Sequence, residues 1–230
     1  MSVPEKDANH SKDANNGKDA NHSEVATTVL QLEMLWPTHD LVRTAPNPAD
    51  ESELPLHLAA GYRLRFYTAG QDDADYVALM VAAGFEDWTA DRLILCQMTA
   101  LPYGWYVAVD ERTDAIVATC MATHRPTPAH PYGGELGWVA AHPDHRGHKL
   151  GWTVCAAVTN RLRRAGYDNI YLKTDDFRAP AILTYLRMGY LPYLYAPDMA
   201  ARWETICTQL QWPYTPAQWP AGGPEPVLGG

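Results

Sequence analysis

Serine, paired cysteines and basic charge are all scarce in this chain of 230 residues, and each scarcity excludes a class of protein. The only serines are at positions 2, 11, 23 and 52, so a serine nucleophile in the folded part is excluded. The four cysteines form no C-x-x-C pair, which argues against a zinc ribbon or a disulfide scaffold and favours reduced thiols. A net charge of -9 argues against nucleic acid as a partner.

Long apolar runs are also missing from the sequence. No run approaches the roughly 18 residues that would span a bilayer, and the polar N-terminus does not resemble a secretory signal. We therefore expect a cytoplasmic protein with no membrane partner. The 47% of hydrophobic residues are nevertheless enough to form a core.

The N-terminal region differs in composition from the rest of the chain. Residues 6–23 are three copies of a hexapeptide, KDANHS, KDANNG and KDANHS, which contain no apolar side chain larger than alanine. Such a segment has nothing to bury, so it is expected to be disordered. The sequence therefore divides into a disordered low-complexity tail (1–25), an N-terminal extension (26–61), a folded domain (62–212) and a flexible Pro/Gly tail (213–230).

The middle of the chain alternates between strand-like and helix-like patterns. Period-2 or apolar runs predict strands, and apolar residues three or four apart predict helices. The expected strands are 28–36, 63–69, a hairpin over 105–124, 135–141, 169–174 and 190–195. The expected helices are 71–85, 89–98 capped by Thr89, 149–164, 180–188 and 199–211. This order predicts a mixed α/β domain with at least one crossover unit.

The stretch ELGWVAAHPDHRGHKLG, from Glu135 to Gly151, is the most informative part of the sequence. A strand is expected to end at Ala141, and a turn then opens the helix over 149–164. Such a turn presents free backbone N–H groups at the positive end of a helix dipole, and its glycines allow a ligand to approach closely. With Arg146 and Lys149 beside it, the turn is a candidate pyrophosphate site. An ordinary strand-to-helix turn is the alternative.

Two motifs in this region resemble the GCN5-related N-acetyltransferase (GNAT) superfamily. The phosphate loop of that family reads Q/R-x-x-G-x-G/A, and here Arg146 and Gly151 match its ends while Lys149 replaces the middle glycine. A later family helix reads N-x-x-A-x-x-x-Y-x-x-x-G-F/Y. Its counterpart here has Arg178 in place of the asparagine, followed by Ala181, Tyr185, Gly189 and Tyr190. The resemblance covers roughly Tyr62 to Tyr195.

The resemblance implies a fold and a reaction. The fold would be a mixed, mostly antiparallel central sheet flanked by helices, with splayed central strands. Residues 62–212 would be an N-acetyltransferase domain that uses acetyl-CoA as co-substrate and needs no metal. It would transfer acetyl directly to a primary amine of a small metabolite or a peptide.

The resemblance also implies roles for individual residues. The N–H groups of Val139 and Ala141 would contact the pantetheine amides and the thioester carbonyl. Arg178 would add a phosphate or pantetheine contact. The pyrophosphate would lie on the loop formed by Arg146, Gly147, His148, Lys149, Leu150 and Gly151.

Two side chains are candidates for the proton transfers. Glu135 would remove a proton from the amine. Tyr185 would donate one to the leaving thiolate. A solvated carboxylate is the alternative for Glu135, and aromatic packing is the alternative for Tyr185. Asp175 and Asp176 could serve as the base or steer a cationic amine, but we favour a role in capping the helix at 180–188.

Several alternatives stay open at this stage. His142, His145 and His148 recur every third residue and could bind a metal, although they fall in the proposed phosphate loop. A non-catalytic acyl-CoA-binding or regulatory module is the second functional hypothesis. An interaction protein that acts through its tail is a third. The acceptor, the acyl chain length and the oligomeric state, with a homodimer as one candidate, cannot be read from the sequence.

Overall fold

The computed structural model describes residues 30–37 and 53–222, so the hexapeptide repeats lie outside the described residues. The strands are β1 (Leu32–Leu35), β2 (Tyr62–Phe66), β3 (Ala100–Asp110), β4 (Ile116–His124), β5 (Gly134–Ala141), β6 (Ile170–Thr174) and β7 (Leu191–Pro192). The α-helices are α1 (Asp73–Ala82), α2 (Ala90–Thr99), α3 (Leu150–Arg164), α4 (Ala179–Met188) and α5 (Met199–Leu210). Most expected elements are therefore found close to their predicted positions.

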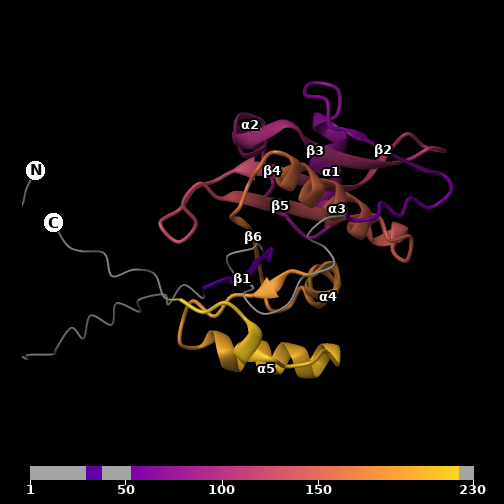
Figure 1. Cartoon of the computed structure of the whole chain (residues 1–230). Coiled ribbons are helices and arrows are strands. Elements are labelled where there is room, and N and C mark those ends of the chain that lie inside the picture. Colours follow the sequence, from indigo (N-terminus) through magenta and orange to yellow (C-terminus); the bar gives the residue numbers. More distant parts are fainter. Residues whose placement is uncertain (1–29, 38–52, 223–230) are drawn as a thin grey trace, which may run out of the picture. The chain divides into compact units, whose positions relative to one another are not determined.

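The described strands form one mostly antiparallel sheet between two layers of helices (Figure 1). The strand order is β2-β3-β4-β5-β6-β1-β7, and the one parallel pair is β5 with β6. This arrangement confirms the fold class expected from the sequence.

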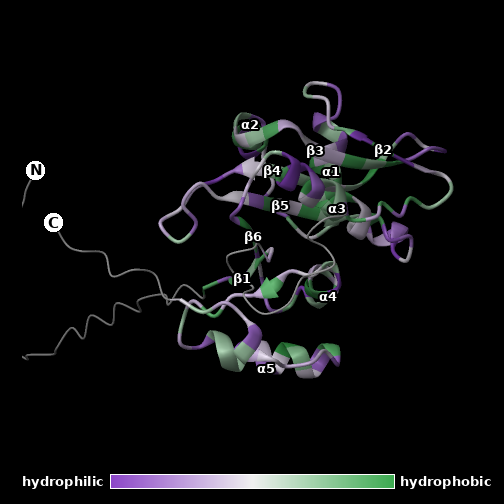
Figure 2. Ribbon diagram, in the orientation of Figure 1, coloured by the Kyte–Doolittle hydropathy of each residue, from purple (hydrophilic) through white to green (hydrophobic). Residues whose placement is uncertain are grey.

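Each face of the sheet is covered by its own apolar cluster. On the first face, α3, α4 and α5 pack against β1, β4, β5 and β6, with Val154, Ile182 and Trp203 fully buried. On the second face, α1 and α2 pack against β3, β4 and β5, with Tyr76 and Met80 fully buried. Figure 2 shows the amphipathic pattern that permits this packing most clearly in α5, where green and purple turns alternate.

β1 is an integral strand of the sheet, although the sequence places it in an N-terminal extension. It pairs antiparallel with β6, where Leu32 faces Thr174, and with β7, where Leu35 faces Leu191. The expected domain boundary at residue 62 is therefore wrong for this segment. The sequence shows a strand-like run at this position but cannot show partners that lie about 140 residues further along the chain.

We expect Leu32→Ala to lower the free energy of unfolding by about 3 kcal/mol, because a buried leucine is replaced by a cavity. Leu32 is fully buried, whereas Leu30, two residues earlier, is 48% exposed. Leu30→Ala is thus the matched control, and its effect should stay within about 0.5 kcal/mol. Urea denaturation of both variants measures the difference. Equal effects would show that β1 does not contribute to the core.

A second segment outside the expected domain, residues 53–58, lies along α3. Leu54 exchanges two hydrogen bonds with the Asn160 side chain, both of 2.9 Å. The indole N–H of Trp152 donates to the Pro55 carbonyl at 3.0 Å, and the Thr153 hydroxyl donates to the His57 carbonyl. These contacts run from Trp152 to Asn160 and fix the segment along most of α3.

The C-terminal part of the chain also differs from expectation. Residues 213–222 were expected in a flexible tail, but Trp219 is only 8% exposed and packs against Trp203 and Tyr214. The Leu194 N–H also donates to the Pro220 carbonyl at 2.9 Å. The aromatic side chains of this segment provide the buried area that its Pro/Gly content concealed. Residues 223–230 lie outside the described residues.

The ends of several elements follow the expected local chemistry. Thr89 caps α2 by accepting a hydrogen bond from the Arg92 N–H, and Gly189 ends α4 with a φ of 103°. The strand expected over 190–195 shrinks to Leu191–Pro192, because proline has no N–H to donate to a ladder. Within the described residues, none of the helices has the length and hydropathy needed to cross a bilayer.

Candidate active site

The two central strands β5 and β6 separate a short distance from their start. They pair at Gly134 with Ile170 and at Glu135 with Tyr171, and the pairing ends there although β5 continues to Ala141. Beyond this point β6 keeps only its pairing with β1, which lies along its other edge. The central strands are therefore splayed, as expected, and one edge of β5 is left without a strand beside it.

A β-bulge lies in β5 at the beginning of this separation. Met121 of β4 pairs with Gly137 and Thr119 pairs with Ala140, so Cys120 faces two residues of β5, Trp138 and Val139. Trp138 has a φ of 53°, which is a strained conformation for a bulky residue. Bulges redirect a strand and are common beside active sites.

The bulge decides which backbone groups of β5 point into the gap. The His142 N–H donates to the Val117 carbonyl on β4 at 2.8 Å. Because N–H groups alternate in direction along a strand, those of Ala141 and Val139 point to the opposite edge, away from β4. Both residues line the cavity described below.

The loop between β5 and α3 has the backbone geometry of an anion site. Gly147 and Lys149 both have positive φ angles, of 86° and 57°. Lys149 therefore adopts the left-handed conformation that favours glycine, at the position where the expected motif has one. In α3, the first backbone N–H that donates to a carbonyl one turn earlier is that of Thr153, and its acceptor is the Lys149 carbonyl. The preceding amides lie at the positive end of the helix dipole.

The histidines of this loop brace it against β2. The Tyr62 hydroxyl and His145 Nδ1 share a hydrogen bond of 2.9 Å. The His148 ring lies 5.1 Å from the Tyr62 ring, and the His142 ring lies 5.6 Å from the His145 ring. In the described part of the chain, no group of three His, Cys, Asp or Glu residues has the arrangement of a metal site.

A cavity of about 740 Å³ opens between this loop, β5 and α4. Its lining includes most of the residues that the motifs single out: Val139, Ala141, Arg146, Gly147, Lys149, Leu150, Gly151, Arg178 and Tyr185. His148 and Glu135 do not line it. The sequence thus identifies most of one wall, although its residues come from three separate elements.

Charge and free space in the cavity suit a polyanionic ligand. Among the described residues, Arg146, Lys149 and Arg187 line the cavity and make no ion pair. A Cβ added to Gly151 would meet no atom within 4 Å, so the space in front of this glycine is open. In a protein of net charge -9, these unpaired cations beside the first amides of α3 make this wall of the cavity locally positive.

Arg178, which replaces the asparagine of the second motif, connects the two sides of the gap. It precedes α4, and its guanidinium lies 4.4 Å from the Phe85 ring centroid on the loop after α1. Its Nε donates to Asp175 Oδ2 at 3.1 Å. Arg178 thus covers part of the cavity, and its ion pair leaves the other guanidinium nitrogens for a ligand.

The two aspartates before α4 are engaged in ion pairs and do not cap the helix, so the preferred interpretation of their role is wrong. α4 has no side-chain cap. Asp175 contacts Arg178 and Gln31, and Asp176 contacts Arg202 at 2.5 Å. The ion pair with Arg202 lowers the pKa of Asp176, which makes it a weaker base.

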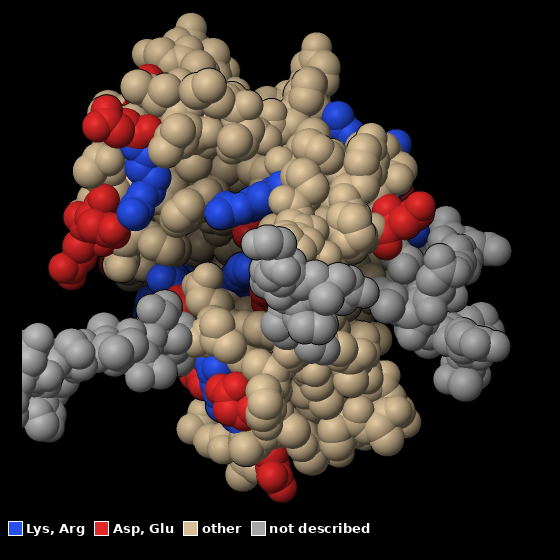
Figure 3. Space-filling model, turned by 90° about the vertical axis from the view of Figure 1, so that its left-hand side faces the viewer, with Lys and Arg blue, Asp and Glu red and all other residues tan. Residues whose placement is uncertain are grey.

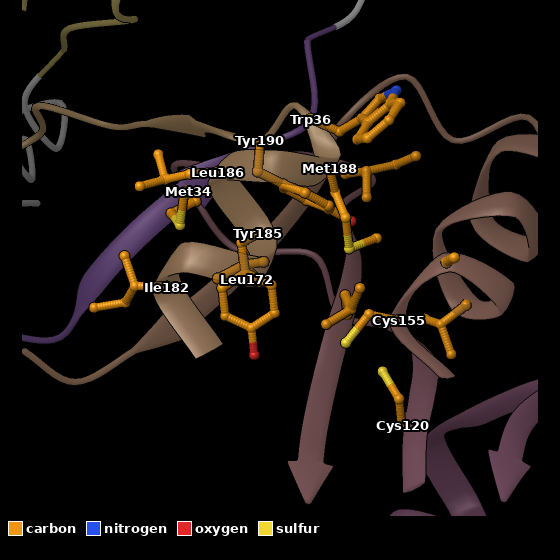
Figure 4. Packing of buried hydrophobic residues seen from close by; sticks show 14 of the residues in the cluster. Met34, Trp36, Cys120, Cys155, Leu172, Ile182, Tyr185, Leu186, Met188 and Tyr190 are labelled. Carbon is orange, nitrogen blue, oxygen red and sulfur yellow. The ribbon is translucent and has the colours of Figure 1, made fainter. Parts of the chain in front are cut away.

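Tyr185 combines packing with access to the cavity. Its side chain is 4% exposed and belongs to the apolar cluster under α4. Figure 4 shows its hydroxyl pointing away from Met34, Leu186 and Tyr190. Burial raises the pKa of Tyr185 well above its ordinary value, so the hydroxyl stays protonated and can donate a hydrogen bond.

Glu135 lies at the point where β5 and β6 separate. It is only 9% exposed, so the alternative of a solvated carboxylate is wrong. Burial raises the pKa of Glu135 above its ordinary value, and Arg125, whose Nη1 is 3.2 Å from Glu135 Oε2, opposes this shift. A carboxylate with a raised pKa is a better proton acceptor than a solvated one.

Sequence reasoning missed part of the cavity wall. His57, Trp152, Cys155, Thr184 and Arg187 also line it. The helical spacing was a usable signal, because Thr184 follows Ala181 by three residues, Arg187 follows Thr184 by three, and residues three or four apart share a helix face. No comparable signal existed for His57, which reaches the cavity through the segment along α3.

Comparison with known proteins gives a consistent picture. The model of the acetyltransferase (GNAT) family matches residues 63–190. A mycothiol acetyltransferase of Sanguibacter keddieii is 28% identical over 172 residues, which is 71% of this chain and 54% of the relative. A mycothiol acetyltransferase of Saccharomonospora viridis is 26% identical over 162 residues, which is 65% of this chain and 52% of the relative. The chain thus spans about half the length of these relatives.

Two solved structures share the fold. A GCN5-related N-acetyltransferase from Sphaerobacter thermophilus has a TM-score of 0.53 and 20% identity, over 71% of this chain and 49% of that one. A tandem GNAT protein from the clavulanic acid biosynthesis pathway has a TM-score of 0.51 and 21% identity, over 73% and 51% of the two chains. At these identities the likeness concerns the fold alone.

Proposed function

The chain belongs to the GNAT acetyltransferase family, and from that membership we propose that it transfers the acetyl group of acetyl-CoA directly to a primary amine of a small molecule. A peptide is the second choice of acceptor. The observation that carries the proposal is the separation of β5 from β6 beside a cavity that the loop between β5 and α3 lines with cations and backbone amides.

The residues present fit coenzyme A. The first amides of α3, at Leu150, Gly151 and Trp152, would hold the diphosphate together with Arg146 and Lys149. The N–H groups of Val139 and Ala141 would bind the pantetheine amides and the thioester carbonyl. There they would stabilise the negative charge that develops on the carbonyl oxygen during attack, an effect worth about 3 kcal/mol for one such donor.

Glu135 would act as the general base. An amine acceptor is mostly protonated at neutral pH, so a proton must leave before the nitrogen can attack. The raised pKa of Glu135 increases its affinity for that proton, while the carboxylate form is kept at pH values above that pKa. Of the other candidates, Asp176 has a pKa lowered by its ion pair with Arg202, and Asp175 is held by Arg178 and Gln31.

We expect Tyr185→Phe to lower kcat by about 10- to 100-fold with little change in the KM for acetyl-CoA, because a donor to the leaving sulfur acts only as the thiolate forms. Removal of one oxygen leaves the ring packing of Tyr185 unchanged. Tyr103→Phe, at a side chain that is 73% exposed, is the control and should retain full activity. Steady-state kinetics of both variants would decide, and a Tyr185→Phe enzyme with unchanged kcat would assign this tyrosine to packing only.

The acceptor and the cellular location form the less specific part of the proposal. The two relatives compared above are both named mycothiol acetyltransferases, and this supports a small-molecule acceptor. This chain, however, spans only about half of their length. We propose the cytoplasm as its location, since all four cysteines are buried free thiols.

Thiol release from acetyl-CoA across a panel of amines, polyamines, amino acids and peptides tests the proposed function. Calorimetry with acetyl-CoA on the same preparation tests binding separately. Saturable binding with acetylation of at least one amine is the expected result. Binding without any acetylation would instead support the alternative, a non-catalytic acyl-CoA-binding or regulatory module.

A further inference from the structure

An ion pair between an exposed arginine and a mostly buried glutamate lies where β5 and β6 separate. Glu135 pairs with Thr123 of β4 in the sheet register, and Arg125 follows one residue after the end of β4, with its N–H still bonded to the Gly133 carbonyl. Arg125 Nη1 lies 3.2 Å from Glu135 Oε2. The carboxylate side chain is 11% exposed and the arginine side chain 61% exposed, so only the arginine is widely open to solvent.

The backbone of Arg125 is fixed on both sides. Its N–H donates to the Gly133 carbonyl at 2.9 Å, and its carbonyl accepts from the Tyr171 hydroxyl at 2.8 Å. Tyr171 in turn stacks on the buried His130 ring, with 4.0 Å between centroids. The backbone at Arg125 is therefore fixed by hydrogen bonds on both sides. One of the five N–H groups of its guanidinium donates to Glu135.

The residue that follows this pair on the same face of β5 has no side chain. Gly137 follows Glu135 on the same face, and a Cβ added there would lie 3.9 Å from the Glu135 carboxyl carbon. The next residue, Trp138, packs against Trp88 and Phe85 at 4.6 and 6.1 Å between ring centroids. Figure 3 shows Lys and Arg side chains beside the hollow that divides one face of the molecule.

The other cation that acts on Glu135 is already engaged. Lys173 contributes to the electrostatic environment of Glu135, but its Nζ lies 2.9 Å from Glu33 Oε1. Glu33 also binds His130 Nε2 at 2.7 Å through its other oxygen. Arg125 is thus the cation beside Glu135 that keeps exposed donors for an incoming anion.

We propose that the acceptor is an α-amino acid, whose ammonium group contacts Glu135 and whose carboxylate contacts Arg125. This inference rests on the proposed acetyl transfer and specifies its substrate class. An amino acid carries opposite charges on adjacent groups, which matches a carboxylate and a guanidinium held 3.2 Å apart. A simple amine would leave the guanidinium without an anion, and a peptide N-terminus would offer it a neutral carbonyl.

The transfer then balances as follows. Glu135 takes one proton from the ammonium group and passes it to water. The amine nitrogen forms a bond to the thioester carbonyl carbon as the bond from that carbon to sulfur breaks. The sulfur leaves with the electron pair and receives the second proton lost by the nitrogen. The products are an N-acetylamino acid, free coenzyme A and one proton in solution.

Matched acceptors test this proposal. Phenylalanine, phenylalaninamide and phenethylamine share a side chain, as do leucine, leucinamide and isopentylamine, so each set varies only the group that would face Arg125. We expect kcat/KM for each amino acid to exceed that of its amide and its amine by at least about tenfold. Arg125→Gln should abolish this preference, and Arg125→Lys should retain part of it.

Arg112→Gln is the matched control, since Arg112 is 82% exposed on the turn between β3 and β4. It should preserve both rate and preference. An equal fall for all acceptors in Arg125→Gln would mean that Arg125 only positions Glu135, and would overturn the proposal. Wild-type acetylation of amines and amides without preference for amino acids would also overturn it while the proposed function stands. Failure of every amine would overturn both.

Discussion

Replacing Glu135 by Gln should lower kcat by about 100- to 10,000-fold, the range usual for loss of a general base. Glutamine keeps the shape of the side chain and can still accept a hydrogen bond from Arg125, so the split between β5 and β6 should persist. Glu135 does not line the cavity, and the Kd for acetyl-CoA should therefore stay within about threefold. Thiol-release assays measure the change in kcat, and calorimetry measures the Kd for acetyl-CoA.

The pH profile gives this prediction a second readout. Burial raises the pKa of Glu135, so activity of the wild type should fall as the pH drops through a value above 4.5, where the carboxylate becomes protonated. This acidic limb should vanish in Glu135→Gln. Arg125→Gln removes a charge that lowers the pKa, so it should move the limb to higher pH. Glu111→Gln, on an exposed turn, is the control, and a Glu135→Gln enzyme of near-normal rate would place the base elsewhere.

The second large effect is expected at Gly151, where coenzyme A binding should depend on the charge of an added side chain. Its missing side chain leaves open space in front of the first turn of α3. Gly151→Ala should leave the Kd for acetyl-CoA within about threefold, because the family motif accepts glycine or alanine at this position and the added Cβ meets no atom within 4 Å. The same change should raise helix stability, by up to about 1 kcal/mol. Gly151→Glu adds a negative charge there and should abolish saturable binding.

The control for these variants is Ala201→Glu, which adds the same charge to an exposed position early in α5. It should leave the Kd for acetyl-CoA unchanged. Calorimetry and thermal unfolding on each variant report binding and stability independently. Unchanged binding in Gly151→Glu, on folded protein, would refute the assignment of this loop to phosphate.

Local chemistry explains which elements could be predicted from the sequence. Thr89 and Gly189 mark helix ends through hydrogen bonding and backbone freedom that depend on few neighbours. The stripe of apolar residues over α3 likewise depends on spacing alone. Signals of this kind lie within one element, so a single sequence is enough to detect them.

Features that depend on distant partners could not be predicted. β1 is recognisable as a strand, but its place between β6 and β7 depends on pairing across most of the chain. The bulge at Trp138 depends on the register of β4 against β5, which no pattern in either strand fixes. Glu135 is buried where β5 pairs with Thr123 of β4 and Tyr171 of β6, and this long-range pairing is why its solvated alternative could not be dismissed beforehand.

The two departures from the family motifs have different structural outcomes. Lys149 keeps the left-handed conformation of the glycine that it replaces, so the loop geometry is retained with an added cation. Arg178 does not simply replace an asparagine, since it stacks on Phe85 across the gap. Comparison with a family motif identifies the positions at which a sequence departs from it. Only the neighbouring residues in the structure show whether the backbone conformation or the side-chain contact is important at each position.

The position of β1 also has a consequence for how the protein is made. β1 leaves the ribosome before β6 and β7, yet it completes the sheet by lying between them. A nascent chain therefore holds an early strand unpaired until nearly the whole domain has been translated. Pairing across such long sequence separations is slow, and exposed strand edges favour aggregation. We expect translation rate and chaperone supply to affect the yield of native protein more than the modest length of the chain would suggest.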